Sequence, residues 1–247
     1  VGLLGQLTAE NYLRKLYGQF DLVLAPSRTC LQKLLDMGIH QTRHQPLGVD
    51  TQVFTPDHRD RWLKRRLGLA ADCRLLVYAG RFSREKNLGS LIAAVEMLGN
   101  PYHLLLIGDG PERDKLMKFA RDIDIDHHIR FTGHRADAAR LLQLMNIFWI
   151  ASDFEGQSNS VMEAMAAGLP VIANDIPPNR ELVIDGETGF LVKVGDRVGF
   201  QQFADRLLAD PELARRLGNA GRERMRQHFS IDQMVESHAR LYRDVLK

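Results

Sequence analysis

The sequence predicts an α/β protein whose main part is a doubly wound, Rossmann-like parallel sheet. Short runs of apolar residues alternate with stretches of helical pattern, and several of the runs end at a glycine. Fully buried strands of parallel sheets read as such near-continuous apolar runs, and the helices between them cover the two faces of the sheet. Repeated strand and helix units of this kind favour one sheet with helices on both sides.

Six runs are predicted as the strands of this sheet. They are RLLVYAG ending at Gly80, HLLLIG at Gly108, HIRFTG at Gly133, NIFWIAS at Ser152, LPVIAND at Asp175 and GFLVKVG at Gly195. Ligands of such sheets bind beyond the carboxyl ends of the strands, near helix N-termini that attract anions. The loops after Gly80, Gly108 and Gly133 are therefore candidate ligand loops. The alternative is that these glycines only make tight turns between strand and helix.

The first fifty residues have a different pattern. They predict a helix at 7–20, a strand at 21–27, a helix at 29–39 and a strand at 44–50, which is too little for a stable sheet of its own. We therefore expect four parts. These are a remnant of another Rossmann-like domain at 1–50, a linker at 51–73, the main domain at 74–230, and a C-terminal helix at 231–247 that packs back toward the first part. The chain begins at Val1, not at methionine, and we expect it to be a piece of a longer protein.

Composition limits the kinds of partner. Lys and Arg number 33 against 31 Asp and Glu, so the net charge of +2 provides no overall field that would attract nucleic acid. Cys30 and Cys73 have no metal-ligand spacing and fit a reducing cytoplasm. No apolar run reaches the length of a membrane span. The arginine-rich helices at the end of the chain predict a solvated amphipathic face, with peripheral contact at the inner membrane surface as the alternative.

Two glutamates flank the loop after the fourth predicted strand, in the stretch FEGQSNSVMEAMAAGLPVIAND. Glu155 falls in the loop, and Glu163 falls in the first turn of a helix predicted to begin near Ser160. A carboxylate accepts two hydrogen bonds from vicinal sugar hydroxyls, and a helix N-terminus favours an anion. The alternative for Ser160 and Glu163 is a capping box, S-x-x-E, which would give Glu163 a structural role. That alternative leaves Glu155 unexplained.

The run GRFSREKN, which follows the first predicted strand, brings two cations to a strand end. Arg81 follows Gly80 directly, and Lys86 lies further along the same turn. Arginine offers a planar fork for phosphate oxygens and lysine a mobile point charge, so the pair suits a diphosphate without any metal. The alternative is a charged turn that faces water.

Two further patterns suggest other ligands. In HLLLIGDGPER, Gly108 and Gly110 resemble a dinucleotide fingerprint, but Arg113 stands where the third glycine is expected. Asp122, Asp124 and Asp126 resemble the paired aspartates that hold a divalent metal. However, they lie before a predicted strand, whereas the ligand loops of such sheets lie after one. We predict a solvated connector for the aspartates and no metal site.

Taken together, these motifs resemble the C-terminal portion of a family 4 glycosyltransferase with the GT-B fold, over essentially the whole chain. The resemblance implies that Glu155 and Glu163 form the E-x7-E pair of that family, with Glu155 facing the donor sugar and Glu163 the ribose. It places Arg81 and Lys86 on the pyrophosphate. It also implies a donor site that includes Gly80, Gly133 near the nucleobase, the backbone of Gly156, Gln157, Ser158 and Asn159, and Ser160 at the helix N-terminus.

The function implied by the resemblance is the retaining, metal-independent transfer of a sugar from a UDP- or GDP-sugar to a sugar, lipid or glycan acceptor. It implies no other cofactor, a cytoplasmic enzyme and a role in cell envelope polysaccharide or glycolipid synthesis. The early strands, glycine-rich loop and histidine of the family's N-terminal domain have no counterpart in this chain, so the piece alone is expected to be inactive. The alternatives are a nucleotide-sugar binding module and a dinucleotide-dependent enzyme that uses the GDG loop.

Overall fold

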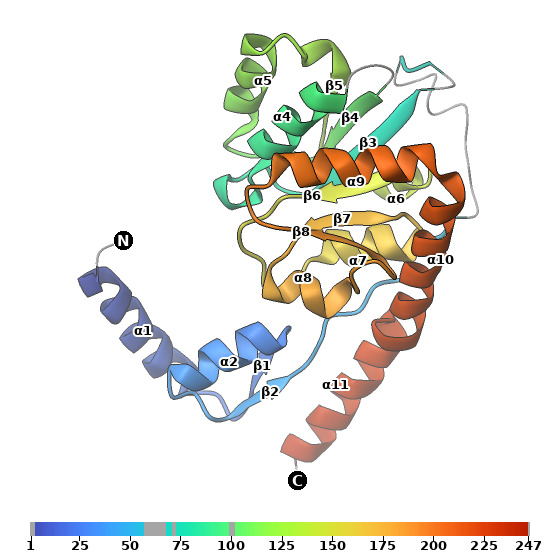
Figure 1. The fold of residues 1–247 in the computed structure, drawn as a ribbon. Coiled ribbons are helices and arrows are strands. Elements are labelled where there is room, and N and C mark those ends of the chain that lie inside the picture. Colours follow the sequence, from blue (N-terminus) through green and yellow to red (C-terminus); the bar gives the residue numbers. More distant parts are fainter. Residues whose placement is uncertain (1–2, 57–67, 71–72, 99–101, 247) are drawn as a thin grey trace.

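The structure, a computed structural model, describes residues 3–56, 68–70, 73–98 and 102–246. Within them, a sheet flanked by helices forms the larger unit, and a smaller unit near the N-terminus lies beside it (Figure 1). The larger unit contains almost the whole of one continuous apolar core, in which the side chains of Leu75, Leu76 and Val77 are fully buried.

The larger sheet has six parallel strands, as the sequence predicts. They are β3 (Arg74–Ala79), β4 (Tyr102–Ile107), β5 (Ile129–Gly133), β6 (Ile147–Ile150), β7 (Val171–Asn174) and β8 (Gly189–Val192). Their order is β5-β4-β3-β6-β7-β8, and every neighbouring pair is parallel. This is the doubly wound order of a Rossmann-like fold, so the predicted fold class is confirmed.

The strand order creates one switch point. From β3 the chain winds outward through β4 to β5, and it then returns to place β6 on the other side of β3. The loops that follow β3 and β6 therefore leave the sheet toward opposite faces and open a crevice at its carboxyl edge. The predicted cation loop and the predicted glutamate loop follow these two strands.

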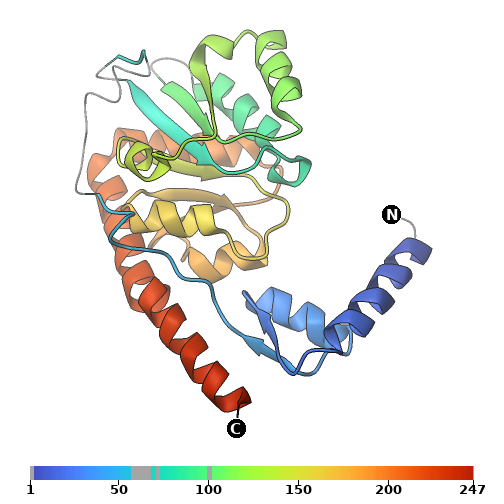
Figure 2. The ribbon, with the colours of Figure 1, turned by 180° about the vertical axis from the view of Figure 1, so that it is seen from behind.

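Helices cover both faces of the sheet. They are α4 (Leu88–Leu98), α5 (Arg113–Asp122), α6 (Ala138–Leu142), α7 (Asn159–Ala166), α8 (Pro177–Leu182), α9 (Arg197–Ala209) and α10 (Pro211–His228), with short 3-10 turns η1 (Arg84–Lys86) and η2 (Asp126–His128). Helix α9 lies in front of the sheet in Figure 1, and α7 lies in front of it in the reverse view of Figure 2. The α9 residue Phe200 meets Trp149 of β6 edge to face, which fixes α9 on its side.

The smaller unit consists of α1 (Leu3–Tyr17), β1 (Val23–Ala25), α2 (Arg28–Asp36) and β2 (Thr42–His44), and its two strands pair in parallel. The strand predicted at 44–50 is wrong in position, because β2 ends at His44. Pro46 has no N–H for a strand ladder, which explains the early end. Residues 45–49, which we call the crossing segment, run from this unit to the larger one.

The C-terminal helix α11 (Ile231–Val245) begins with a capping box formed by Ser230 and Gln233. It lies along the crossing segment, where the Ser237 hydroxyl donates to Gln45 Oε1 at 2.7 Å. Of the predicted linker 51–73, residues 57–67 and 71–72 lie outside the described residues. Among the described helices, none is both long and apolar enough to cross a membrane.

Candidate functional site

A cleft of about 610 Å3 opens at the carboxyl ends of β3, β4, β5 and β6, at the switch point. It collects nine of the predicted site residues: Gly80, Arg81, Lys86, Glu155, Gln157, Ser158, Asn159, Ser160 and Glu163. Two further predicted residues, Gly133 and Gly156, do not line it. The structure thus brings together residues from two loops that are far apart in the sequence.

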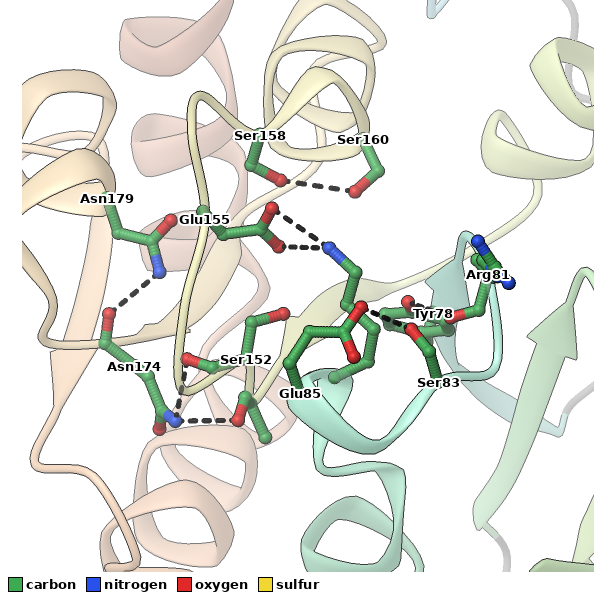
Figure 3. A network of polar contacts seen from close by, with 12 residues as sticks. Tyr78, Arg81, Ser83, Glu85, Ser152, Glu155, Ser158, Ser160, Asn174 and Asn179 are labelled. Atoms are coloured by element: carbon green, nitrogen blue, oxygen red, sulfur yellow. Dashed lines mark hydrogen bonds and ion pairs between the residues drawn. The ribbon is translucent and has the colours of Figure 1, made fainter. Parts of the chain in front are cut away.

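Glu155 and Lys86 form an ion pair across the cleft (Figure 3). The Lys86 ammonium donates to both carboxylate oxygens of Glu155, at 2.8 and 2.9 Å. The Glu155 side chain is only 8% exposed, so its charge lies away from water and depends on this partner. Lys86 therefore pairs with Glu155 in the structure, whereas the sequence predicts it beside Arg81 as a second phosphate ligand.

Residues 151–158, between β6 and α7, form what we call the donor loop. The first two residues of this loop are held by Asn174 of β7, whose side chain is fully buried. Its amide donates to the carbonyl oxygens of Ala151 and Ser152 at 2.7 and 3.2 Å. Asn179 of α8 donates in turn to the Asn174 carbonyl oxygen at 2.8 Å (Figure 3). Such buried amide contacts hold the loop that carries Glu155 at a defined height above the sheet.

The cation loop after β3 is held by a buried tyrosine. The Tyr78 hydroxyl donates to the carbonyl oxygen of Arg81 at 3.0 Å, and burial raises the pKa of Tyr78 well above its usual range, so it remains a donor. The Arg81 guanidinium itself is exposed and has no salt-bridge partner among the described residues. It is therefore available for an anion in the cleft.

Glu163 has a different setting from the one predicted. Helix α7 begins at Asn159 with Ser158 as its N-cap residue, so Glu163 lies in the second helical turn. The proposed capping box of Ser160 and Glu163 is wrong, because Ser160 already stands inside the helix. Burial raises the pKa of Glu163, and no described residue pairs with its carboxylate. A half-buried carboxylate without a partner in a cleft is typical of a ligand contact.

The start of α7 adds anion-binding groups to the same cleft. No side chain caps the first turn, so its N–H groups have no protein partner there. Asn159 and Ser160, the first two helical residues, line the cleft. The helix dipole and these N–H groups favour negative charge between α7 and Arg81.

Tyr78 and Ala138 line the cleft although the sequence prediction gives them no role. His134 and Arg135 also line it, in the FTGHR loop that the sequence predicts near the nucleobase, and so does Asp109, in the candidate ligand loop after Gly108. Arg135 forms a two-bond ion pair with Asp137, at 2.7 and 2.6 Å. Its charge is therefore partly neutralised, and Arg81 remains the stronger phosphate candidate.

The glycines of the GDG run have a packing role. A Cβ on Gly108 would lie 1.9 Å from the carbonyl oxygen of Gly80, and one on Gly110 would lie 2.4 Å from that of Phe82. Only glycine permits this contact between the loops after β3 and β4. The run also follows β4, the second strand of the winding order, whereas a dinucleotide fingerprint follows the first. This geometry disfavours the dinucleotide interpretation.

The aspartate run lies at the opposite edge of the sheet. Asp122 pairs with Lys118 on α5, whereas ligand atoms of Asp124, Asp126 and His127 lie within 4.8 Å of one another. All three of the latter residues are exposed and precede β5. A second cavity, of about 690 Å3, also lies at this amino edge, near Arg74, Asn146 and Pro170. Ligands of such sheets bind at the other edge, so both features are weaker candidates.

Comparison with known proteins identifies the family. Residues 60–224 match the model of a protein family described as "Glycosyl transferases group 1". The chain belongs to this family. It is 33% identical over 178 residues to the lipopolysaccharide core biosynthesis glycosyltransferase LpsE of Rhizobium meliloti, a match that covers 72% of this chain and 52% of LpsE. A putative glycosyltransferase of Bacillus subtilis, EpsD, is 33% identical over 201 residues, which is 79% of this chain and 52% of EpsD. The chain thus spans about half the length of these curated relatives.

Solved structures confirm the GT-B fold of this chain. Anabaena HepE, solved in complex with UDP and glucose, superposes on this chain with a TM-score of 0.91 at 22% identity. The match covers 96% of this chain and 67% of the HepE chain. The sucrose-phosphate synthase of Thermosynechococcus elongatus has a TM-score of 0.83 at 30% identity, over 92% of this chain and 58% of its own. The similarity extends over both the small unit and the sheet.

Proposed function

We propose that this chain binds the nucleoside diphosphate sugar donor of a retaining, metal-independent sugar transfer. The observation that supports this most strongly is the placement of an exposed arginine, a free helix N-terminus and two acidic side chains around one cleft at the switch point. Cationic and N–H groups suit a diphosphate, and carboxylates suit hydroxyls. These are the groups that a nucleotide sugar presents.

Each residue has a proposed role in binding. Arg81 and the first turn of α7 neutralise the diphosphate, and Glu163 accepts hydrogen bonds from the ribose hydroxyls. Glu155 accepts hydrogen bonds from the hydroxyls of the sugar, while Lys86, which donates to both of its oxygens, keeps its carboxylate oriented. The loop of His134, next to Gly133, borders the nucleobase.

The same groups account for chemistry at the anomeric carbon. As the bond to the diphosphate breaks, negative charge grows on the leaving group and positive charge on the sugar. Arg81 and the α7 N-terminus are already in place to stabilise the negative charge on the leaving diphosphate. The activation barrier is lower because these groups need no reorganisation during the reaction. The binding of ribose and sugar hydroxyls fixes the reacting geometry.

The identity of donor and acceptor is left to experiment. Among the relatives, a mycobacterial protein 32% identical over 191 residues is named a GDP-mannose-dependent α-mannosyltransferase, and HepE was solved with UDP. We propose a UDP- or GDP-sugar donor and a sugar, lipid or glycan acceptor in envelope glycan or glycolipid synthesis, on the cytoplasmic side. We expect the 247 residues to bind donor but transfer little sugar, because the chain spans about half the length of the curated relatives that it matches.

Calorimetric titration of the 247-residue chain with UDP, GDP and NAD+, each with and without EDTA, tests this function. We expect one nucleoside diphosphate to bind, NAD+ not to bind, and EDTA to change nothing, because Asp124, Asp126 and His127 lie at the other edge of the sheet. Binding of NAD+ alone would support the dinucleotide alternative. A requirement for magnesium or manganese would contradict the metal-independent site.

A further inference from the structure

The donor loop is contacted by the smaller unit as well as by the cation loop. The Lys33 ammonium lies 4.4 Å from the ring centroid of Phe154, and the Cys30 thiol donates to the Gly156 carbonyl oxygen at 3.7 Å. Glu155, between these two residues in the sequence, accepts instead from Lys86. The loop is therefore joined both to the cation loop and to the smaller unit.

The shortest of these contacts involves Gln157. Its side-chain Oε1 accepts a hydrogen bond from the backbone N–H of Leu47 at 2.7 Å, in a half-buried setting. Leu47 belongs to the crossing segment, not to a strand, so its N–H has no sheet partner. Loss of the Gln157 oxygen would leave this N–H unsatisfied in the interior.

The crossing segment is itself tightly fixed at this point. A Cβ on Gly48 would lie 2.7 Å from the Cα of Ile231, so the two chain segments that connect the units touch each other through backbone. The Val49 N–H donates to the Phe229 carbonyl oxygen at 2.8 Å, and the Ile231 N–H donates to the Val49 carbonyl oxygen at 3.0 Å. Leu47 can therefore shift little unless both connections move together.

We propose that Gln157 is a positioning residue for the donor sugar, because it ties the donor loop to the crossing segment and so fixes where Glu155 meets the sugar. This role rests on the function proposed above for the same cleft. The sugar-contacting part of the loop then follows the arrangement of the two units. The protein groups proposed to bind the diphosphate, Arg81 in the loop after β3 and the first turn of α7, do not. The hydrogen bond thus couples the fit of the sugar to the relative position of the units.

Three substitutions in the 247-residue chain separate this role from simple packing. Gln157→Leu removes the acceptor at similar volume, Gln157→Asn keeps an amide that is too short to reach, and Gln157→Glu keeps an oxygen at the same distance. Gln201→Leu is the matched control, since Gln201 is also half-buried but pairs with Asp205 on its own helix α9. Calorimetry with UDP and UDP-glucose, and with GDP and GDP-mannose, measures binding, and amide exchange by NMR follows the Leu47 N–H.

For Gln157→Leu and Gln157→Asn we expect about tenfold weaker binding of the nucleotide sugar, less than twofold change for the diphosphate, and about tenfold faster exchange of the Leu47 amide. Gln157→Glu should restore the amide protection and most of the sugar affinity, and Gln201→Leu should match the parent. An unchanged ratio of the two affinities in Gln157→Leu overturns the positioning role while leaving the proposed function intact. A parent chain that binds none of these ligands contradicts the proposed function and this role with it.

Discussion

The two carboxylates of the cleft differ in what surrounds them. Glu155 is nearly buried and bound to Lys86 through both oxygens, whereas Glu163 is half-buried and has no partner among the described residues. A buried charge with a bidentate partner is held in one orientation, and a buried charge without one destabilises the folded protein. The proposed contact of Glu163 with the ribose would explain why the protein keeps a carboxylate that lowers its stability.

Glu163→Gln tests this explanation through two independent measurements. Because burial raises the pKa of Glu163, the folded state holds its proton more tightly than the unfolded state does. The free energy of unfolding is therefore highest while Glu163 is protonated, and it falls as the pH rises above the ordinary glutamate pKa of about 4.5. We expect the variant to be more stable than the parent at pH 7, with a difference that shrinks toward pH 4.5, and to bind the nucleoside diphosphate about tenfold more weakly.

The matched control for that experiment is Glu96→Gln, an exposed glutamate on α4. It should change neither the pH dependence of the free energy of unfolding nor the affinity. A Glu163→Gln protein with parent affinity would remove Glu163 from the ribose site. Parent-like stability across the pH range would show that its carboxylate is solvated.

At the scale of elements, the strands were predictable because each consists of consecutive apolar residues that a parallel sheet buries on both faces. The shared edge also follows from the sequence, since the loops after the first and fourth strands leave the carboxyl ends of parallel strands, which brings Arg81 and Glu155 to one edge. The strand order that makes this edge a switch point is known only from the structure. Helix and strand ends were less predictable. Helix α7 starts at Asn159, one residue before the predicted start, and β2 ends at His44 because Pro46 follows. The Gln157 contact with Leu47 has no local signal at all.

Close packing between elements positions the cleft. Helix α10 crosses the end of α7 so closely that a Cβ on Gly218 would lie 2.1 Å from the Gly168 carbonyl oxygen. We expect Gly218→Ala to lower the free energy of unfolding by about 1–3 kcal/mol, because α10 must move away. Gly89→Ala, also within a helix but with open space around its Cβ, should be neutral or stabilising by up to about 1 kcal/mol. Chemical denaturation of both variants measures this, and equal effects would contradict the packing argument.

At the scale of the whole molecule, two chain crossings join a small unit to a Rossmann-like unit. The crossing segment and the start of α11 bond to each other, and the donor loop bonds to the crossing segment. Figures 1 and 2 show α11 extending from the larger unit past this junction. The chain spans about half the length of the curated relatives that it matches. Donor binding in the cleft is therefore the step of the proposed reaction that can be tested directly with this chain.

The claim that this cleft takes a nucleoside diphosphate depends most on Arg81, whose guanidinium is exposed, while Lys86 is bound to Glu155. Arg84, an exposed arginine of the same turn that does not line the cleft, is the matched control.

The decisive measurement is therefore the affinity of Arg81→Ala for the nucleoside diphosphate and for its nucleoside, UDP with uridine or GDP with guanosine. A lost charge-assisted hydrogen bond is worth about 1.5–3 kcal/mol, so we expect the diphosphate to bind about 10- to 150-fold more weakly. The nucleoside should bind as it does to the parent, and Arg84→Ala should change neither. Equal losses for diphosphate and nucleoside, or no loss at all, would contradict the placement of the diphosphate in this cleft.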